Sequence, residues 1–233
     1  MATFVIAHGA WSSGFAWKKM RPLLRAAGHD IFTPSYTGLG ERAHLATPDV
    51  SLETHIQDVV NVLFYEDLQD VILMGHSYGG MVATGVADRA SGRIRKVIYL
   101  DAFVPKDGES LNDLARPPDG SLSGGPPPAE GWLIPPLPTS ADATPEDLAW
   151  LTPRRGPQPR KTFEEPVRLT GAVDGLPRVY IYCLQIRQGD VFGQFAARAR
   201  TEAGWQYEEI DATHSPNVTA PEALTAILLR HAD

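Results

Sequence analysis

Two patterns of hydrophobic residues alternate along the first hundred positions of the chain. Short apolar runs rich in β-branched residues, at 4–7, 71–74 and 96–100, predict buried strands. Two stretches with apolar residues three or four positions apart, 15–27 and 52–63, predict helices with one buried face. Because strands alternate with helices, the sequence predicts an α/β fold with a mostly parallel sheet covered by helices on both faces.

The same alternation returns near the end of the chain. Residues 178–183 and 205–210 predict two further strands, and residues 191–203 predict a helix between them. A last helix is expected to follow Thr219, with Thr219 as its N-cap and Pro221 in its first turn.

A proline-rich segment, residues 105–166, interrupts this alternation. Within it only Pro145 to Leu151 predicts a helix, with Thr144 as its N-cap. The segment carries more large apolar residues than a solvated linker would, namely Trp132, Leu133, Ile134, Leu137, Trp150 and Phe163. Because it is inserted between two sheet strands, we interpret residues 105–166 as a cap over a pocket, and residues 1–104 and 167–233 as the α/β core.

Composition and charge limit the possible partners. The 233 residues are 43% hydrophobic and 21% charged, which is typical of a globular protein with a large core. The net charge of −7 and the lack of a basic run argue against nucleic-acid or membrane partners. The single cysteine, Cys183, lies in an apolar run and predicts a buried, inert thiol. The chain opens directly into its first strand, so we expect a cytoplasmic protein.

The strongest chemical signal is the sequence Gly75-His76-Ser77-Tyr78-Gly79, which lies between a predicted strand and a predicted helix. It matches the G-x-S-x-G pattern, in which glycines permit a tight turn that raises the serine hydroxyl above the sheet edge. The turn also directs the first N–H groups of the following helix at whatever the serine attacks. We therefore predict that Ser77 is a nucleophile.

A serine hydroxyl needs a base within hydrogen-bonding distance to attack at neutral pH. Of the seven histidines, only His214 lies in a loop directly after a late strand, at the sheet edge where Ser77 also emerges. We predict that His214 is the base. His8 and His76 flank glycine turns and are expected to brace those loops. The other histidines are expected in packing or surface positions: His29, His44, His55 and His231.

Several motifs occur in a characteristic order. They are His8-Gly9-Ala10-Trp11, Thr37-Gly38-Leu39-Gly40-Glu41-Arg42, Gly75-His76-Ser77-Tyr78-Gly79-Gly80 and His214. With them the chain resembles the α/β-hydrolase superfamily, and within it the bacterial esterases related to plant methyl esterases and hydroxynitrile lyases. The resemblance covers essentially the whole chain and is weakest in the proline-rich cap. It implies a triad in the order Ser, Asp or Glu, His, and an oxyanion hole from the N–H groups of Ala10 and Tyr78.

The acid of the triad is where the sequence departs from the superfamily pattern. The resemblance places the acid shortly after the strand at 178–183, yet no carboxylate follows that strand until Asp190. Some relatives, such as haloalkane dehalogenases, take the acid from the end of the strand after the nucleophile's strand, which here gives Asp101. An acid at the end of an adjacent strand is well placed to reach the base, so we favour Asp101 over Asp190.

These residues predict a serine hydrolase of the carboxylesterase type that acts on small to medium hydrophobic esters through an acyl-enzyme. Trp11 and Trp132 are predicted to contact the substrate. No metal or organic cofactor is expected, because no cluster of His, Cys or carboxylates has ligand spacing. The partner is a small-molecule ester, and the protein is expected to be a monomer or a homodimer.

Two other functions are compatible with this scaffold. A hydroxynitrile lyase would use the same triad, but the resemblance implies a lysine beside its catalytic histidine, and here Ser215 follows His214. A ligand-binding protein without catalysis is the second alternative. Labelling of Ser77 by a fluorophosphonate distinguishes an activated serine from an inert one.

Overall fold

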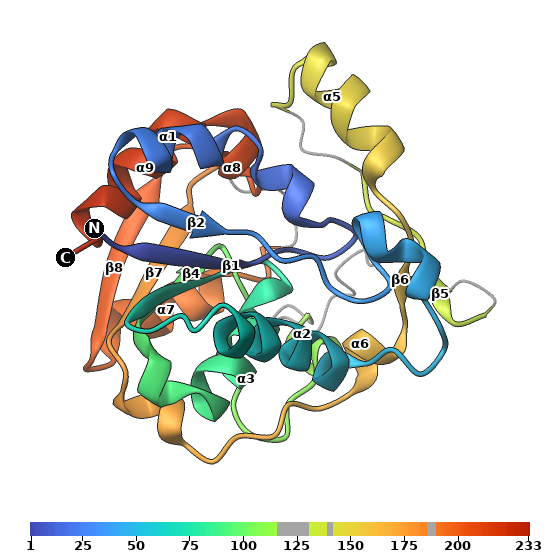
Figure 1. The fold of residues 1–233 in the computed structure, drawn as a ribbon, viewed down its shortest axis with the longest axis horizontal. Coiled ribbons are helices and arrows are strands. Elements are labelled where there is room, and N and C mark those ends of the chain that lie inside the picture. The colour runs from blue at the N-terminus through green and yellow to red at the C-terminus, as the bar shows by residue number, and fades with distance from the viewer. Residues whose placement is uncertain (116–130, 139–141, 186–189) are drawn as a thin grey trace.

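The computed structural model describes residues 1–115, 131–138, 142–185 and 190–233, and in these residues six parallel strands form one central sheet (Figure 1). The strands are β1 (Thr3–Ala7), β2 (Asp30–Phe32), β3 (Val71–His76), β4 (Ile94–Leu100), β7 (Arg178–Cys183) and β8 (Trp205–Ile210). Their order across the sheet is β2-β1-β3-β4-β7-β8. The predicted α/β fold is confirmed.

Helices cover both faces of this sheet (Figure 1). On one face lie α1 (Met20–Ala26) and α9 (Pro221–Arg230), and on the other lie α2 (Leu52–Tyr65), α3 (Gly79–Arg89) and α7 (Gly193–Thr201). A hydrophobic core lies on each face of the sheet, and the side chains of successive β3 residues enter the two cores alternately. Leu73 packs toward α2 and α3, whereas Ile72 and Met74 pack toward α1 and α9. This double burial explains why the strand is one continuous apolar run.

The predicted helix over residues 15–27 is wrong as a single element. The structure has a short 3-10 helix, η1 (Gly14–Trp17), followed by α1. The break has a clear cause in Pro22, which has no N–H to donate to the carbonyl of Lys18 and whose ring would collide with that carbonyl in a continuous α-helix. By starting at Met20, α1 places Pro22 in its first turn, where no intrahelical donor is needed.

The predicted N-cap of the last helix is also wrong. Thr219 ends a separate short helix, α8 (Pro216–Thr219), and its hydroxyl donates to the carbonyl of Ser215. The N-cap position of α9 belongs to Ala220, which has no side-chain acceptor. Pro221 does open α9, as expected. Among the described residues, no helix is both long enough and apolar enough to cross a membrane.

The described parts of the segment interpreted as a cap contain short elements. They are α4 (Leu111–Leu114), β5 (Leu133–Ile134), α5 (Pro145–Leu151), β6 (Gln158–Pro159) and α6 (Lys161–Glu164), and β5 pairs with β6 in antiparallel orientation. The prediction for α5 is confirmed, since Thr144 accepts a hydrogen bond from the N–H of Asp147 at 3.1 Å. An ion pair between Asp147 and Lys19 (2.6 Å) ties α5 to the core. Residues 116–130 and 139–141 of the predicted cap lie outside the described residues.

Close packing of α3 against the strands requires glycine at the start of that helix. A Cβ built at Gly79 would lie 2.0 Å from the carbonyl oxygen of Ala7, and one at Gly80 would lie 2.0 Å from that of Phe103. Both oxygens belong to the backbone, so no side-chain rotation can relieve the overlap. The G-x-S-x-G turn can therefore sit between β1 and β4 only because these positions lack side chains.

We predict that Gly79→Ala destabilises the protein by about 3 kcal/mol or more, because β1 and α3 must separate to admit the methyl group. Gly92→Ala is the matched control: a Cβ added at Gly92 would meet nothing within 4 Å, so this variant should change stability by less than about 0.5 kcal/mol. Urea unfolding of both variants measures the difference. Equal unfolding midpoints would contradict this account of the turn.

Candidate active site

Ser77 occupies the turn between β3 and α3 in a strained conformation. Its φ of 56° lies in the left-handed region, which a residue with a side chain rarely adopts. Its N–H donates to the carbonyl of Leu100 (3.3 Å), and its own carbonyl accepts from the N–H of Phe103 (3.2 Å). The turn is thus held by the chain that leaves β4, which keeps the Ser77 hydroxyl at the carboxyl edge of the sheet.

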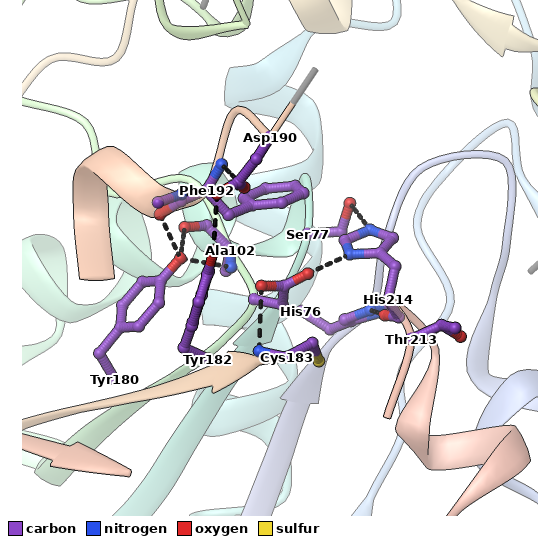
Figure 2. A network of polar contacts seen from close by, with 12 residues as sticks. His76, Ser77, Ala102, Tyr180, Tyr182, Cys183, Asp190, Phe192, Thr213 and His214 are labelled. Atoms are coloured by element: carbon purple, nitrogen blue, oxygen red, sulfur yellow. Dashed lines mark hydrogen bonds and ion pairs between the residues drawn. The ribbon is translucent and has the colours of Figure 1, made fainter. Parts of the chain in front are cut away.

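His214 lies in the loop between β8 and α8 and makes hydrogen bonds through both ring nitrogens. Its Nε2 accepts from the Ser77 hydroxyl at 2.9 Å, and its Nδ1–H donates to Oδ2 of Asp101 at 2.7 Å. Figure 2 shows the imidazole of His214 beside the Ser77 hydroxyl. The structure therefore brings together the serine, the histidine and the favoured carboxylate that the sequence singled out.

Asp101 is held firmly where β4 ends. The residue is 5% exposed, its φ is 41°, and its N–H donates to the carbonyl of Ile181 at 2.8 Å. Its second carboxylate oxygen, Oδ1, accepts from the N–H of Cys183 at 3.4 Å, at the long end of the hydrogen-bonding range. The Cys183 side chain is buried, as predicted, and burial raises the pKa of its thiol.

Asp190, the alternative acid, is occupied elsewhere. One carboxylate oxygen accepts from the N–H groups of Phe192 (2.9 Å) and Gly193 (3.0 Å) where α7 begins, and the other accepts from the Tyr182 hydroxyl at 2.6 Å (Figure 2). The Phe192 ring that follows is stacked on the imidazole of His214, with centroids 4.8 Å apart. Phe192 could not be singled out from the sequence, because the pattern over residues 191–203 places it in the first turn of a predicted helix, whereas in the structure it precedes α7.

His76 braces the backbone of the loop that carries His214. Its Nε2–H donates to the His214 carbonyl oxygen at 2.7 Å, and the two rings lie 4.9 Å apart (Figure 2). Burial, together with the nearby charge of a protonated His214, lowers the pKa of His76 to about 3. His76 is therefore neutral at pH 7, and one of its nitrogens is committed to this brace.

Two more buried histidines form a stack behind the Ser77 turn. The ring of Tyr36 lies between those of His8 (3.8 Å) and His55 (4.6 Å). His8 donates from Nδ1 to the Gly9 carbonyl (2.9 Å) and accepts at Nε2 from the N–H of Tyr36 (3.3 Å). Burial lowers the pKa of His8 to about 4 and that of His55 to about 3, so both rings are neutral. The predicted bracing of loops by His8 and His76 is confirmed.

His55, expected in ordinary packing, joins the stack to the residue after the nucleophile. Its Nε2–H donates to the Thr37 carbonyl at 3.0 Å, and its Nδ1 accepts from the Tyr78 hydroxyl at 2.8 Å. The spacing of apolar residues in α2 placed His55 on the buried face, but it carried no indication of this partner.

The other predicted site residues lie around the same edge. A Cβ built at Gly9 would come within 3.3 Å of the Ser77 Cβ, so the loop that carries Ala10 lies directly against the serine. The indole N–H of Trp11 donates to the carbonyl of Ile134 in β5 at 3.0 Å. Trp132 is half-buried just before β5 and is not part of the hydrogen-bonded group around His214. Within the described residues, no group of three or more His, Cys, Asp or Glu side chains could hold a metal ion.

Comparisons with known proteins identify the family of this chain. The family model described as the alpha/beta hydrolase family matches residues 4–227. A carbendazim hydrolyzing esterase from Nocardioides sp. (strain SG-4G) is 40% identical over 96% of this chain and 97% of its own length. A pyrethroid hydrolase from Sphingobium wenxiniae is 26% identical over 98% of this chain and 87% of its own length.

A solved structure gives the same result. It is an extracellular alpha/beta-hydrolase from a Paenibacillus species, described as sharing structural and functional homology with tobacco salicylic acid binding protein 2. It superimposes with a TM-score of 0.85 at 26% identity and covers 100% of this chain and 99% of its own. The chain belongs to the α/β hydrolase family. Its esterase relatives place it among the carboxylesterase-type enzymes of that family.

The neutral histidines predict an acid-sensitive fold. Each has an ordinary pKa of 6.5, and in the folded protein the value falls to about 4 for His8 and about 3 for His55 and His76. Below pH 6.5 the unfolded chain therefore binds more protons than the folded protein, so stability is fully present above pH 6.5 and is lost as the pH falls toward 4. Each such histidine contributes a slope of about 1.4 kcal/mol per pH unit in this window.

The slope is measured from urea unfolding between pH 4.5 and 6. We expect His55→Gln, which removes one of these groups, to reduce the slope by about 1.4 kcal/mol per pH unit, the contribution of one bound proton. An unchanged slope would contradict the assignment of His55 as a neutral buried base.

Proposed function

We propose that this carboxylesterase-type α/β hydrolase cleaves small to medium hydrophobic esters through an acyl-enzyme on Ser77. The observation that carries the proposal is the continuous hydrogen-bonded chain from the Ser77 hydroxyl through His214 to Asp101, with links of 2.9 and 2.7 Å. A hydroxyl that donates to a neutral imidazole, itself oriented by a buried carboxylate, is the arrangement that activates serine for attack.

In the first half of the reaction, the Ser77 oxygen bonds to the ester carbonyl carbon while its proton passes to Nε2 of His214. Asp101 stabilises the imidazolium that results. The carbonyl oxygen becomes an oxyanion, for which we assign the N–H groups of Ala10 and Tyr78 as donors. Neither N–H donates to a protein acceptor within the described residues, so both are free to bind the oxyanion. Each donor contributes about 3 kcal/mol to lowering the barrier.

Collapse of this intermediate breaks the ester bond and leaves the acyl group on Ser77. The departing alcohol takes the proton from His214, which returns to its neutral form. A water molecule then gives its proton to His214 and attacks the acyl carbon, and the acid product leaves as the proton returns to Ser77. The chain needs no other group for either half of this cycle.

The substrate site in this proposal lies between the core and the cap, residues 105–166. Trp11 and Trp132 supply apolar contact there, and Trp11 already joins the two parts through its bond to Ile134. Two relatives are named for hydrolysis of carbendazim and of pyrethroids, and we extend hydrolysis of small organic molecules to this chain. We further propose that it acts in the cytoplasm, as a monomer or a homodimer.

The pair Asp101→Asn and Asp190→Asn tests which carboxylate serves His214. Asparagine at Asp101 can hold the imidazole in the wrong tautomer, so kcat for p-nitrophenyl acetate should fall by about 10⁴. Asp190→Asn should change kcat by less than about tenfold, because Asp190 bonds to the Tyr182 hydroxyl and to backbone N–H groups where α7 begins, and not to His214. Stopped-flow and steady-state assays give kcat, and Ser77→Ala supplies the inactive baseline.

A larger loss of kcat in Asp190→Asn than in Asp101→Asn would assign the triad acid to Asp190, the commoner position in the superfamily. Retained turnover in Ser77→Ala would contradict the proposed function as a whole, whatever the two aspartate variants do. Thermal unfolding of all three variants confirms that each loss of activity occurs in a folded protein.

A further inference from the structure

The backbone directly after Ala10 is strained and needs support. Trp11 has a φ of 56°, which is unfavourable for a residue with a bulky side chain, and it follows Ala10 directly. Such a conformation persists only where neighbouring groups enforce it. The direction of the Ala10 N–H is set by the orientation of the Gly9–Ala10 peptide. This peptide is joined to the Ala10–Trp11 peptide through the φ and ψ angles of Ala10, so support of the second peptide also limits movement of the first.

On the core side, His8 supports the first of these peptides. Its Nδ1–H donates to the Gly9 carbonyl oxygen at 2.9 Å, and this carbonyl shares a peptide plane with the Ala10 N–H. The other His8 nitrogen accepts from the Tyr36 N–H, so the ring has a defined tautomer. Because the peptide is planar, holding its carbonyl also orients the N–H on its opposite side.

On the cap side, Gln158 supports the second peptide. Its Oε1 accepts from the N–H of Trp11 at 2.8 Å, although the two residues are 147 positions apart in the chain. Gln158 is fully buried, and its amide nitrogen donates to the hydroxyl of Thr162 at 2.9 Å. The Thr162 hydroxyl donates to the carbonyl of Pro159, so it is available as the acceptor and the orientation of the Gln158 amide is settled.

The same short cap segment also rests against Trp11 and Tyr78. The Phe163 ring lies 5.6 Å from the ring of Trp11 and 5.6 Å from that of Tyr78. The segment 158–163 thus contacts the residue after one assigned donor and the side chain of the other. A cap that served only to cover a pocket would not need a fully buried amide aimed at the backbone of the core.

We propose that Gln158 is a positioning residue of the oxyanion hole. It holds the Ala10–Trp11 peptide from the cap side, as His8 holds the Gly9–Ala10 peptide from the core side, and so keeps the Ala10 N–H directed at the reacting carbonyl. The inference rests on the proposed function, in which Ala10 is a donor. It makes part of the catalytic geometry depend on a residue that the cap supplies.

The test compares Gln158→Leu with Gln158→Glu in the full-length protein. Leucine removes the acceptor of the Trp11 N–H, so kcat for p-nitrophenyl acetate should fall by about tenfold or more while KM changes less than about twofold, because the donor acts on the oxyanion. Glutamate keeps an acceptor at the same reach and should retain kcat within about threefold. The affinity for a trifluoromethyl ketone, which forms an oxyanion on the serine, should fall in parallel with kcat.

Thr162→Val is the matched control. It removes the other hydrogen bond of Gln158 but leaves the acceptor of the Trp11 N–H in place, so it should lower the melting temperature and leave kcat within about threefold. Equal losses of kcat in Gln158→Leu and Thr162→Val, or unchanged kcat in Gln158→Leu, would overturn the inference. If Gln158→Leu does not fold, Gln158→Met takes its place with the same expected loss.

Wild-type protein and Ser77→Ala are assayed in parallel, which separates a failure of the proposed function from a failure of the role of Gln158. An active Ser77→Ala variant would contradict the proposed function itself. An inactive Ser77→Ala variant together with an unaffected Gln158→Leu variant would leave the proposed function intact and reject only the role of Gln158.

Discussion

The register between β3 and β4 is the constraint on which the site depends. His76 pairs with Leu100, so the residues that follow these two positions, Ser77 and Asp101, leave the sheet side by side. Both adopt a positive φ, of 56° and 41°, as the chain turns out of each strand. The nucleophile and the buried carboxylate are thus neighbours because parallel strands are paired, before any side-chain contact forms.

This register also explains the other polar residues at the edge. With Asp101 already placed between two strand ends, Asp190 accepts from the N–H of Phe192 just before α7, and the Phe192 ring stacks on His214. The loop that carries His214 must then reach the pair from β8, and His76 fixes its backbone by donating to the His214 carbonyl. Burial keeps His76 neutral, so the brace adds no charge beside the imidazole of His214.

How far the sequence predicts this structure depends on how local each signal is. The ends of β7, β8 and α5 agree with the sequence to the residue. An apolar run marks β7, aromatic residues two positions apart mark β8, and a threonine followed by proline marks the start of α5. Ser77, His214 and the favoured Asp101 could also be found from their positions at strand ends. The bond from Trp11 to Gln158 could not, because it joins residues 147 positions apart through a backbone N–H that has no sequence signature. The break between η1 and α1 could be predicted from Pro22. In the sequence, however, the helical spacing of the apolar residues around Pro22 outweighs that signal.

The central claim is that Ser77 becomes covalently acylated during turnover. It is tested most directly by mixing the protein with excess p-nitrophenyl acetate, quenching with acid within milliseconds, and measuring the intact mass followed by peptide mapping. The account predicts one acetyl group per protein, located on Ser77, which forms as p-nitrophenol is released in a burst and disappears as the ester is exhausted. Continuing turnover with Ser77 unmodified, or with the acetyl group on another residue, would contradict it.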